Sequence, residues 1–343
     1  MEAATGFRDS TAAYLILIDP NGKLVWLHAG GLDQVKIRFY SRRNSSIWKR
    51  MAATTTSEAL SRAQTLRCLD KLPKLSPLMT QLLARLARRN CDLKELNSII
   101  EKDALLSAQV LRLANSAAFG RAQPIHSVKH AIAMLGVGCI RKFALGASIA
   151  NLFSRRPSTP AFSIVRFNLH SVATATLLEL LTDEIPIQFA SGAFVAGLLH
   201  DVGSLIIAVS MPVQYDTILS MAAVTGDSIL ECERQVLGTD HAELGALAIA
   251  RWDLDEPIRW AAYYHHAPDQ EPVNKPPERG GLSLGAAVQK VDDFVDYLGM
   301  SILPSRPQTQ EAPALEFPGF PFSQERLLKR FEIEWKGMGD LFQ

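Results

Sequence analysis

The chain has 343 residues, of which 48% are hydrophobic and 21% are charged. This content is sufficient for a sizeable core and excludes a disordered protein. The 36 basic and 35 acidic residues nearly cancel, so the composition gives no overall attraction to nucleic acid or to an anionic membrane, and we expect neither as a direct partner.

The cysteines and the start of the chain indicate a compartment. Cys68, Cys91, Cys139 and Cys232 stand far apart and form no metal-binding spacing, so we interpret them as buried thiols in a reducing environment. The longest apolar runs are too short or too interrupted for the roughly 20 residues that a bilayer span requires. The first residues do not resemble a signal peptide. We therefore expect a cytoplasmic protein.

Residues 1–57 form an extension that differs from the rest of the chain. The stretch AAYLILIDPNGKLVWLHAGG contains an apolar strand, a Pro-Asn-Gly turn and a second strand, which is typical of a β-hairpin. The first fifty residues carry eight basic and four acidic residues. Two interpretations stay open. Either translation starts naturally at Met51, and the preceding segment is upstream sequence, hairpin-like or disordered, or the segment is a basic arm that docks on a partner.

From about residue 58 the pattern is helical. In SPLMTQLLARLARR, Ser76 and Pro77 form a cap and first-turn pair, and leucines at 78, 82, 83 and 86 share one helix face. No stretch from 60 to 270 alternates long enough to predict a strand, so we expect an all-α architecture of roughly ten to twelve helices. Further helices are predicted in 92–102, 104–120, 127–153 with a break at Gly136–Gly138, 165–181, 188–208, 213–226, 228–238, 241–254, 256–268, 283–299 and 323–342.

Five of the eight histidines fall in the second half of the chain, on separate predicted helices or at their ends: His170, His200, His241, His265 and His266. Imidazole and carboxylate together are ligands for Zn, Mn or Fe, and such a metal can activate water toward phosphate esters. His200 and Asp201 are adjacent, so on a regular helix their side chains would diverge by about 100°. Both can face one metal only if the helix end is distorted or one of them acts through a bridge, and Gly203 provides a place for a break.

Five segments follow one another in a consistent order from about Leu72 to Pro268: IIEKDALLSAQVLRLANSAAFG, SVKHAIAMLGVGCIRKFAL, GLLHDVGSLI, ECERQVLGTDHAELGALAIARWDL and IRWAAYYHHAP. Together they resemble the HDOD family, the HD-related output domains of bacterial signalling proteins within the HD phosphohydrolase superfamily. The resemblance implies an N-terminal helical subdomain, about 58–155, and a pseudo-HD subdomain, 156–270, followed by C-terminal loops and helices in 271–343. It also implies a regulatory role that is exerted through contact with another signalling protein.

The resemblance extends to a ligand set. Catalytically active HD-GYP relatives take their metal ligands from an upstream His, the HD pair, a later His, a paired HH and a downstream Asp. The matching positions here are His170, His200, Asp201, His241, His265, His266 and either Asp292 or Asp293. His200 and Asp201 are also the catalytic candidates. Two departures point away from turnover: Ser204 stands where active relatives carry a phosphate-binding Lys, and the GYP motif is absent.

Structural interpretations stand beside these. Each histidine could pack or cap a helix end, and the group together could form a buried hydrogen-bonded network without metal. Asp240 and Glu243 fit a capping box before His241. Asn115 and Ser116 shape a tight corner before Gly120 or present a weak protein-interaction surface.

Three functions are therefore carried forward. The first is a non-enzymatic signalling module with a degenerate HD-type pocket. The second is a metal-dependent phosphohydrolase acting on a nucleotide, a cyclic dinucleotide or another phosphoester. The third is a sensor that binds a nucleotide or a metal without turnover.

Overall fold

The computed structural model describes the backbone of 14–18 and 24–28, and residues 60–75, 77–83, 92–116, 124–153, 159–272, 281–303 and 315–335. The chain divides into two compact units, each of which is described by itself. One unit comprises Met1–Thr65 and Val213–Asp240, and the other comprises Leu66–Pro212 and His241–Gln343. The all-α fold class is confirmed, and the predicted domain boundaries stay predictions.

The first unit contains the predicted hairpin. Strand β1 (Tyr14–Ile18) pairs antiparallel with β2 (Leu24–His28), which confirms the two predicted strands, while the predicted turn lies outside the described residues. The other predictions for the extension lie outside the described residues. The helices of this unit are α2 (Arg62–Leu66, whose last residue belongs to the second unit), α11 (Pro212–Thr225, whose first residue does) and α12 (Ile229–Leu237).

The second unit begins with a group of short helices followed by one long helix. They are η1 (Arg67–Lys71), α3 (Pro77–Gln81), α4 (Leu93–Ile100), α5 (Ala104–Ala114), α6 (Val128–Leu135) and α7 (Val137–Phe153). Side chains of Asp92, Asp103 and Ser127 cap α4, α5 and α6. The predicted break is confirmed: Gly136 has a φ of 87°, and α6 and α7 meet at a bend of 119°. Of the helix predicted from Ser76 onward, residues 84–90 lie outside the described part.

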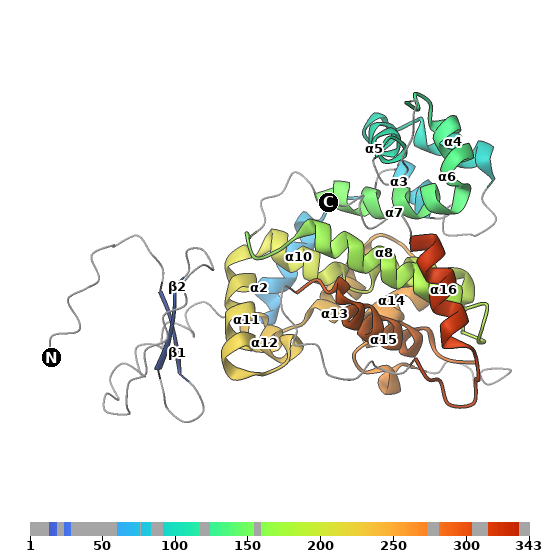
Figure 1. Ribbon diagram of the computed structural model, residues 1–343. Coiled ribbons are helices and arrows are strands. Elements are labelled where there is room, and N and C mark those ends of the chain that lie inside the picture. The colour runs from blue at the N-terminus through green and yellow to red at the C-terminus, as the bar shows by residue number, and fades with distance from the viewer. Residues whose placement is uncertain are drawn as a thin grey trace. The chain divides into compact units, whose positions relative to one another are not determined.

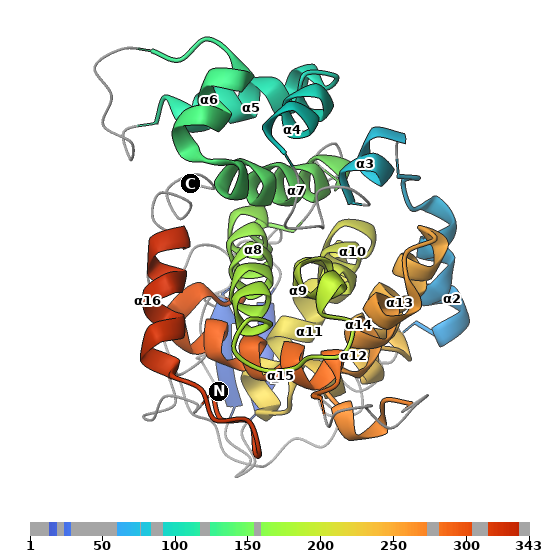
Figure 2. The same ribbon diagram turned by 90° about the vertical axis from the view of Figure 1, so that its right-hand side faces the viewer.

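The rest of the second unit is built around α8 (Ile164–Leu181), which is buried almost throughout from Phe167 onward. Figures 1 and 2 show α7 crossing one end of α8, with α4, α5 and α6 on its far side. The other described helices of this unit lie around α8. They are η4 (Ala190–Gly192), α9 (Ala193–Leu199), α10 (Val202–Ser210), α13 (His241–Arg251), α14 (Glu256–Tyr264), η5 (Pro268–Gln270), α15 (Leu284–Val295), η6 (Asp296–Met300) and α16 (Gln324–Trp335). Among described residues from 60 onward, strand-like pairing is limited to one isolated bridge, Ile187 to Leu282.

Buried charges join α7 to α8. Arg141 on α7 donates to both carboxylate oxygens of Glu179 on α8, at 2.8 and 2.7 Å, and its guanidinium lies 4.8 Å from the ring centre of Phe194. Lys142, 2% exposed, lies 3.7 Å from Glu179 and bonds to Glu334 on α16. A fully desolvated bidentate pair depends strongly on both partners being present.

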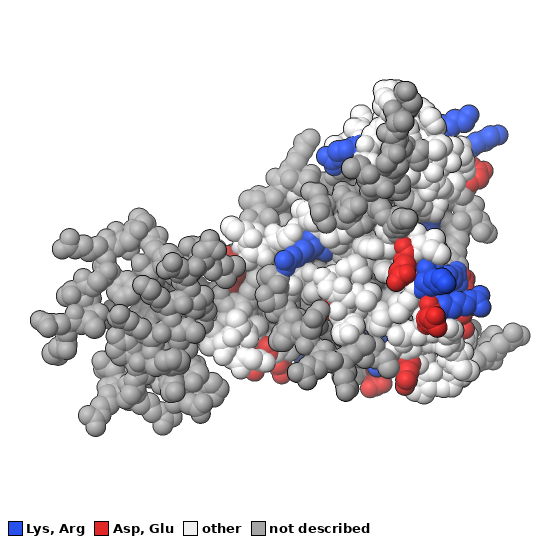
Figure 3. Space-filling model, viewed as in Figure 1, with Lys and Arg blue, Asp and Glu red and all other residues white. Residues whose placement is uncertain are grey.

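Helix α16 is held on α8 by surface ion pairs as well as by its apolar face. Leu327 and Phe331 are buried, while Arg330 pairs with Asp183 at 2.6 Å and with Glu184 at 3.0 Å, just beyond the end of α8. Figure 3 shows basic and acidic side chains gathered together over α16. The C-terminal helix is therefore an integral part of the second unit.

Two expectations need correction. The stretch Ala190–Ser210 is longer and more apolar than predicted: by length and hydropathy it could cross a membrane, but 94% of its most apolar window is buried inside the protein, as in the core helix of a globular fold. The thiols are also less buried than expected. Only Cys232 is buried among the described cysteines, while Cys68 and Cys139 are half-buried and Cys91 lies outside the described residues.

Candidate metal centre

The predicted ligand residues come from five places in the second unit. His170 lies in the second turn of α8, His241 opens α13, His265 and His266 follow the end of α14, and Asp292 lies on α15. His200 and Asp201 form the junction between α9 and α10. These elements lie against one another, so residues as far apart as 170 and 292 share one region.

The helix break lies at Asp201 and not at Gly203, where the sequence predicts it. Asp201 has φ −102° and ψ 14°, which interrupts the helix, while Gly203 lies inside α10. Because the backbone turns between them, His200 Nε2 and Asp201 Oδ2 come within 3.6 Å of each other. The adjacent pair therefore faces one centre, which a regular helix would prevent.

Two glycines bring the helices close enough to form the cluster. A Cβ at Gly197 on α9 would lie 2.7 Å from Ala175 Cα on α8, so only glycine permits the approach that brings His200 to His170. A Cβ at Gly203 would lie 1.9 Å from the carbonyl oxygen of His241. Gly203 therefore acts through close packing, which brings the start of α13 to Asp201.

The first group of donors lies on the Oδ2 side of Asp201. His170 Nε2 is 3.2 Å from His200 Nε2, 3.1 Å from Asp292 Oδ1 and 3.7 Å from Asp201 Oδ2. His200 Nε2 lies 3.5 Å from the same oxygen of Asp292. His170, His200 and Asp201 thus direct one nitrogen or oxygen each toward one another, and Asp292 lies against both imidazoles.

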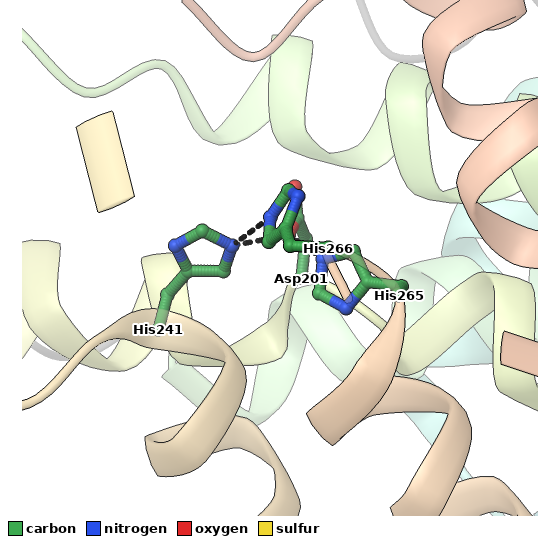
Figure 4. Close-up of side chains that lie close together, drawn as sticks. All are labelled: Asp201, His241, His265 and His266. Carbon is green, nitrogen blue, oxygen red and sulfur yellow. Dashed lines mark hydrogen bonds and ion pairs between the residues drawn. The ribbon is translucent and has the colours of Figure 1, made fainter. Parts of the chain in front are cut away.

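The second group lies on the Oδ1 side of Asp201, as Figure 4 shows in part. His241 Nε2 is 3.3 Å from Asp201 Oδ1 and 2.8 Å from His266 Nε2. His265 Nε2 lies 3.5 Å from Asp201 Oδ1. The donor atoms of Asp201, His241, His265 and His266 all lie within 4.8 Å of one another. Asp201 is therefore shared between two histidine groups.

Backbone carbonyls fix the orientation of two rings. His200 Nδ1 donates to Gly197 O and His265 Nδ1 donates to Ala262 O, each at 2.8 Å. With the proton held on Nδ1, the lone pair of Nε2 is free to face the cluster. This is the tautomer that a metal-ligating histidine uses when its other nitrogen is hydrogen-bonded.

The charges of the cluster perturb its pKa values in both directions. Burial lowers the pKa of His170, but the hydrogen bond and charge of Asp292, together with Asp201 and Asp296, outweigh it and raise the pKa to about 9. The pKa of His200 is raised in the same way, against burial, mainly by Asp201. Burial raises the pKa of Asp201, but the surrounding imidazoles lower it more strongly. The pKa of Asp201 therefore falls well below its usual range. Desolvation of the ring, together with the neighbouring His265 and His241, depresses the pKa of His266, although part of this side chain is exposed.

The residues fit a divalent metal. Asp201 Oδ1 and His265 Nε2 are both buried, and neither makes a well-aligned hydrogen bond. They face each other at the long distance of 3.5 Å, so the pair leaves part of its bonding capacity unused. In two pairs of histidines, Nε2 faces Nε2: His170 with His200, and His241 with His266. Because two lone pairs repel each other, each pair requires either a shared proton or a common electrophile. Imidazole and carboxylate are ligands that Zn, Mn and Fe accept. The buried His and Asp clusters could therefore hold a metal.

The structure also distinguishes among the other predicted residues. Asp292 faces the cluster, while its neighbour Asp293 is exposed. Asn115 and Ser116 lie at the end of α5, where the Asn115 amide donates to Leu111 O and Ile125 O and its oxygen accepts from Ile125 N. These bonds tie the end of α5 to Ile125.

One residue near the cluster was missed from the sequence. Asp296 Oδ1 lies 3.4 Å from His170 Nδ1, on the side of the ring that faces away from His200. The spacing of Asp292 and Asp296, four residues apart on one helical face, was a signal that could have found it.

Comparisons with known proteins agree with the fold. The family model of the HDOD domain matches residues 72–268. A solved HDOD domain protein of unknown function from Geobacter sulfurreducens is 21% identical, with a TM-score of 0.62 over 82% of this chain and 99% of that one. A structure from Shewanella amazonensis SB2B named "Putative phosphohydrolase" is 20% identical, with a TM-score of 0.56 over 81% of this chain and 98% of that one. An uncharacterized protein of Treponema pallidum is 22% identical over 58% of this chain, which spans only 38% of that relative.

Proposed function

Because this chain belongs to the HDOD family, we propose that it is a regulatory module of bacterial signal transduction whose pseudo-HD subdomain holds a divalent metal, Mn, Fe or Zn. It acts in the cytoplasm through contact with another signalling protein. The observation that carries the metal is Asp201, which turns one oxygen to each of two histidine groups and leaves Oδ1 buried without a well-aligned hydrogen bond.

The neutral side chain of Ser204 supports regulation over turnover. It is half-buried on α10, three residues after Asp201, where active relatives carry a Lys. A site that must neutralise a transferring phosphoryl group gains several kcal/mol from such a cation. A ligand set that lacks this cation is better suited to holding a metal in a fixed arrangement than to rapid phosphoester hydrolysis.

Metal stoichiometry of the full chain tests the proposal. The protein is purified without chelator or His tag beside a His200→Ala/Asp201→Ala double variant, and both are measured by inductively coupled plasma mass spectrometry. We expect near-stoichiometric Mn, Fe or Zn in the wild type and a loss in the double variant. A folded wild type that takes up none of the three metals on titration would refute the metal centre and leave the cluster as a hydrogen-bonded network.

A metal-dependent phosphohydrolase is the second candidate, with a nucleotide, cyclic dinucleotide or other phosphoester as substrate. The observation in its favour is that every histidine of the fuller ligand set converges, and that His266 is exposed at the edge of the cluster. A divalent metal, when bound, supplies a Lewis acid for phosphoester chemistry. The chain would contribute buried imidazoles that orient it and an open edge at His266 for the ligand.

Turnover distinguishes the two candidates. Hydrolysis of bis(p-nitrophenyl) phosphate and of cyclic dinucleotides is measured with Mn, Fe and Zn. Substantial activity that is lost in both His200→Ala and Asp201→Ala would favour the enzyme. If the protein holds metal but stays inactive, a thermal shift with nucleotides tests the sensor, because a ligand at 100 times its Kd stabilises the fold by about 2.7 kcal/mol.

A further inference from the structure

The outer nitrogen of His170 faces two acceptors that none of the predicted ligands provides. His170 Nδ1 lies 3.2 Å from the carbonyl oxygen of Met300 and 3.4 Å from Asp296 Oδ1. Its Nε2 faces the opposite way, 3.1 Å from Asp292 Oδ1. Asp292 and Asp296 are one helical turn apart, so the ring is wedged between two carboxylates of one helical segment.

Asp292 and Asp296 contact opposite nitrogens of His170, so the two carboxylates have different roles. The nitrogens of one imidazole point away from each other, so only one of them can face the cluster. His170 Nε2 is the nitrogen that meets His200 Nε2. Asp296 therefore lies behind the ring, where it contacts His170 without entering the group of donors around Asp201.

The backbone is shaped to place these acceptors. After α15 the helix widens into η6, and Gly299 there has a φ of 83°, a conformation that side-chain-bearing residues rarely adopt. This turn directs the Met300 carbonyl to His170. The ring is itself 1% exposed, so its orientation depends on protein groups and not on solvent.

We propose that Asp296 is a positioning residue, which, together with the Met300 carbonyl, holds the proton of His170 on Nδ1 and so aims Nε2 at the metal. The proposal rests on the metal centre proposed above. A carboxylate that accepts the outer N–H of a metal-ligating imidazole fixes the ring and raises its basicity. Loss of such a partner typically weakens metal binding by about 10- to 100-fold.

The test compares four full-length proteins: wild type, Asp296→Ala, Asp296→Asn and the control Asp293→Ala, which removes a neighbouring exposed carboxylate. Zn and Mn affinities are measured by calorimetry. We expect Asp296→Ala to bind about 10- to 100-fold more weakly, Asp296→Asn to recover part of the loss because its amide oxygen still accepts, and Asp293→Ala to match the wild type.

A second readout does not depend on metal. In the metal-free protein the side-chain Nδ1 proton of His170 is followed by proton–nitrogen correlation spectroscopy. We expect a downfield, slowly exchanging resonance in the wild type that moves upfield and exchanges faster in Asp296→Ala. If the resonance and the affinities are unchanged in Asp296→Ala, the positioning role is wrong. If the wild type binds no metal, the proposed metal centre is wrong. The proton resonance then still decides whether Asp296 holds the His170 ring.

Discussion

Gly203→Ala tests whether close packing of α10 on α13 assembles the cluster. The new methyl group would lie 1.9 Å from the carbonyl oxygen of His241, 2.7 Å from its carbonyl carbon and 2.9 Å from the amide nitrogen of Gly245. All three contacted atoms belong to backbone, so no side-chain rotation relieves the clash. An ordinary contact requires about 3.4 Å, so the start of α13 must retreat by about 1.5 Å.

The expected cost follows from that displacement. Overpacking a core usually costs about 1–3 kcal/mol, and a clash with backbone on this scale belongs at the upper end, so we expect a loss of about 3 kcal/mol in the free energy of unfolding. The same movement carries His241 away from Asp201, which it now meets at 3.3 Å. Metal affinity should therefore fall together with stability.

Urea unfolding followed by circular dichroism measures the first effect, and metal calorimetry the second. Gly138→Ala is the matched control, because Gly138 lies in α7 and an added Cβ there meets nothing within 4 Å. We expect that control to be neutral or stabilising by up to about 1 kcal/mol. A Gly203→Ala protein that is within about 1 kcal/mol of the wild type and binds metal normally would refute the packing argument.

Three further predictions concern charge. Glu179→Gln leaves Arg141 buried without its carboxylate, so urea unfolding should show a loss of about 3–5 kcal/mol, whereas Asp183→Asn, at a surface ion pair, should cost at most about 1 kcal/mol. The metal-free protein should lose roughly 3 kcal/mol of unfolding free energy through His170 as pH rises from about 6.5 through 9, because the pKa of His170 is raised to about 9 and its stabilising contribution is complete only below the unfolded-state value. His170→Gln should reduce the slope but not abolish it, because the pKa of His200 is raised as well. Zn at 100 times its Kd should stabilise the wild type by about 2.7 kcal/mol and release protons, and a His200→Ala/Asp201→Ala protein should show neither effect.

The helical architecture was accessible from the sequence because its signals are local. Apolar periodicity and the Gly136 break each act within one or two turns, and the structure confirms the helices at α4, α5, α6 and α7 and the break between the last two. The seven residues placed together in the cluster were named from the order of motifs and not from any local signal, since nothing in the spacing of His170 and His200 shows that the two rings meet.

What the sequence could not provide depends on how helices approach one another. Arg141 pairs with Glu179, which lies 38 positions away in the chain. Nothing in the sequence around either residue identifies the other as its partner. Gly203 was correctly noted but assigned to a break, because a glycine that permits a bend and a glycine that permits close approach look alike in a sequence. Asp296 was missed because its role depends on the direction of one imidazole ring.

The position of α15 has a consequence for where this domain can be cut. The region that matches the family model ends at residue 268, yet Asp292 and Asp296 lie beyond that point and face His170. Glu334, still further on, is the nearest partner of the buried Lys142. A fragment trimmed to the matched region would lack one wall of the histidine cluster and would leave the buried Lys142 with only its longer contact to Glu179, at 3.7 Å. Expression, crystallisation and fusion designs should therefore keep the chain through at least Trp335.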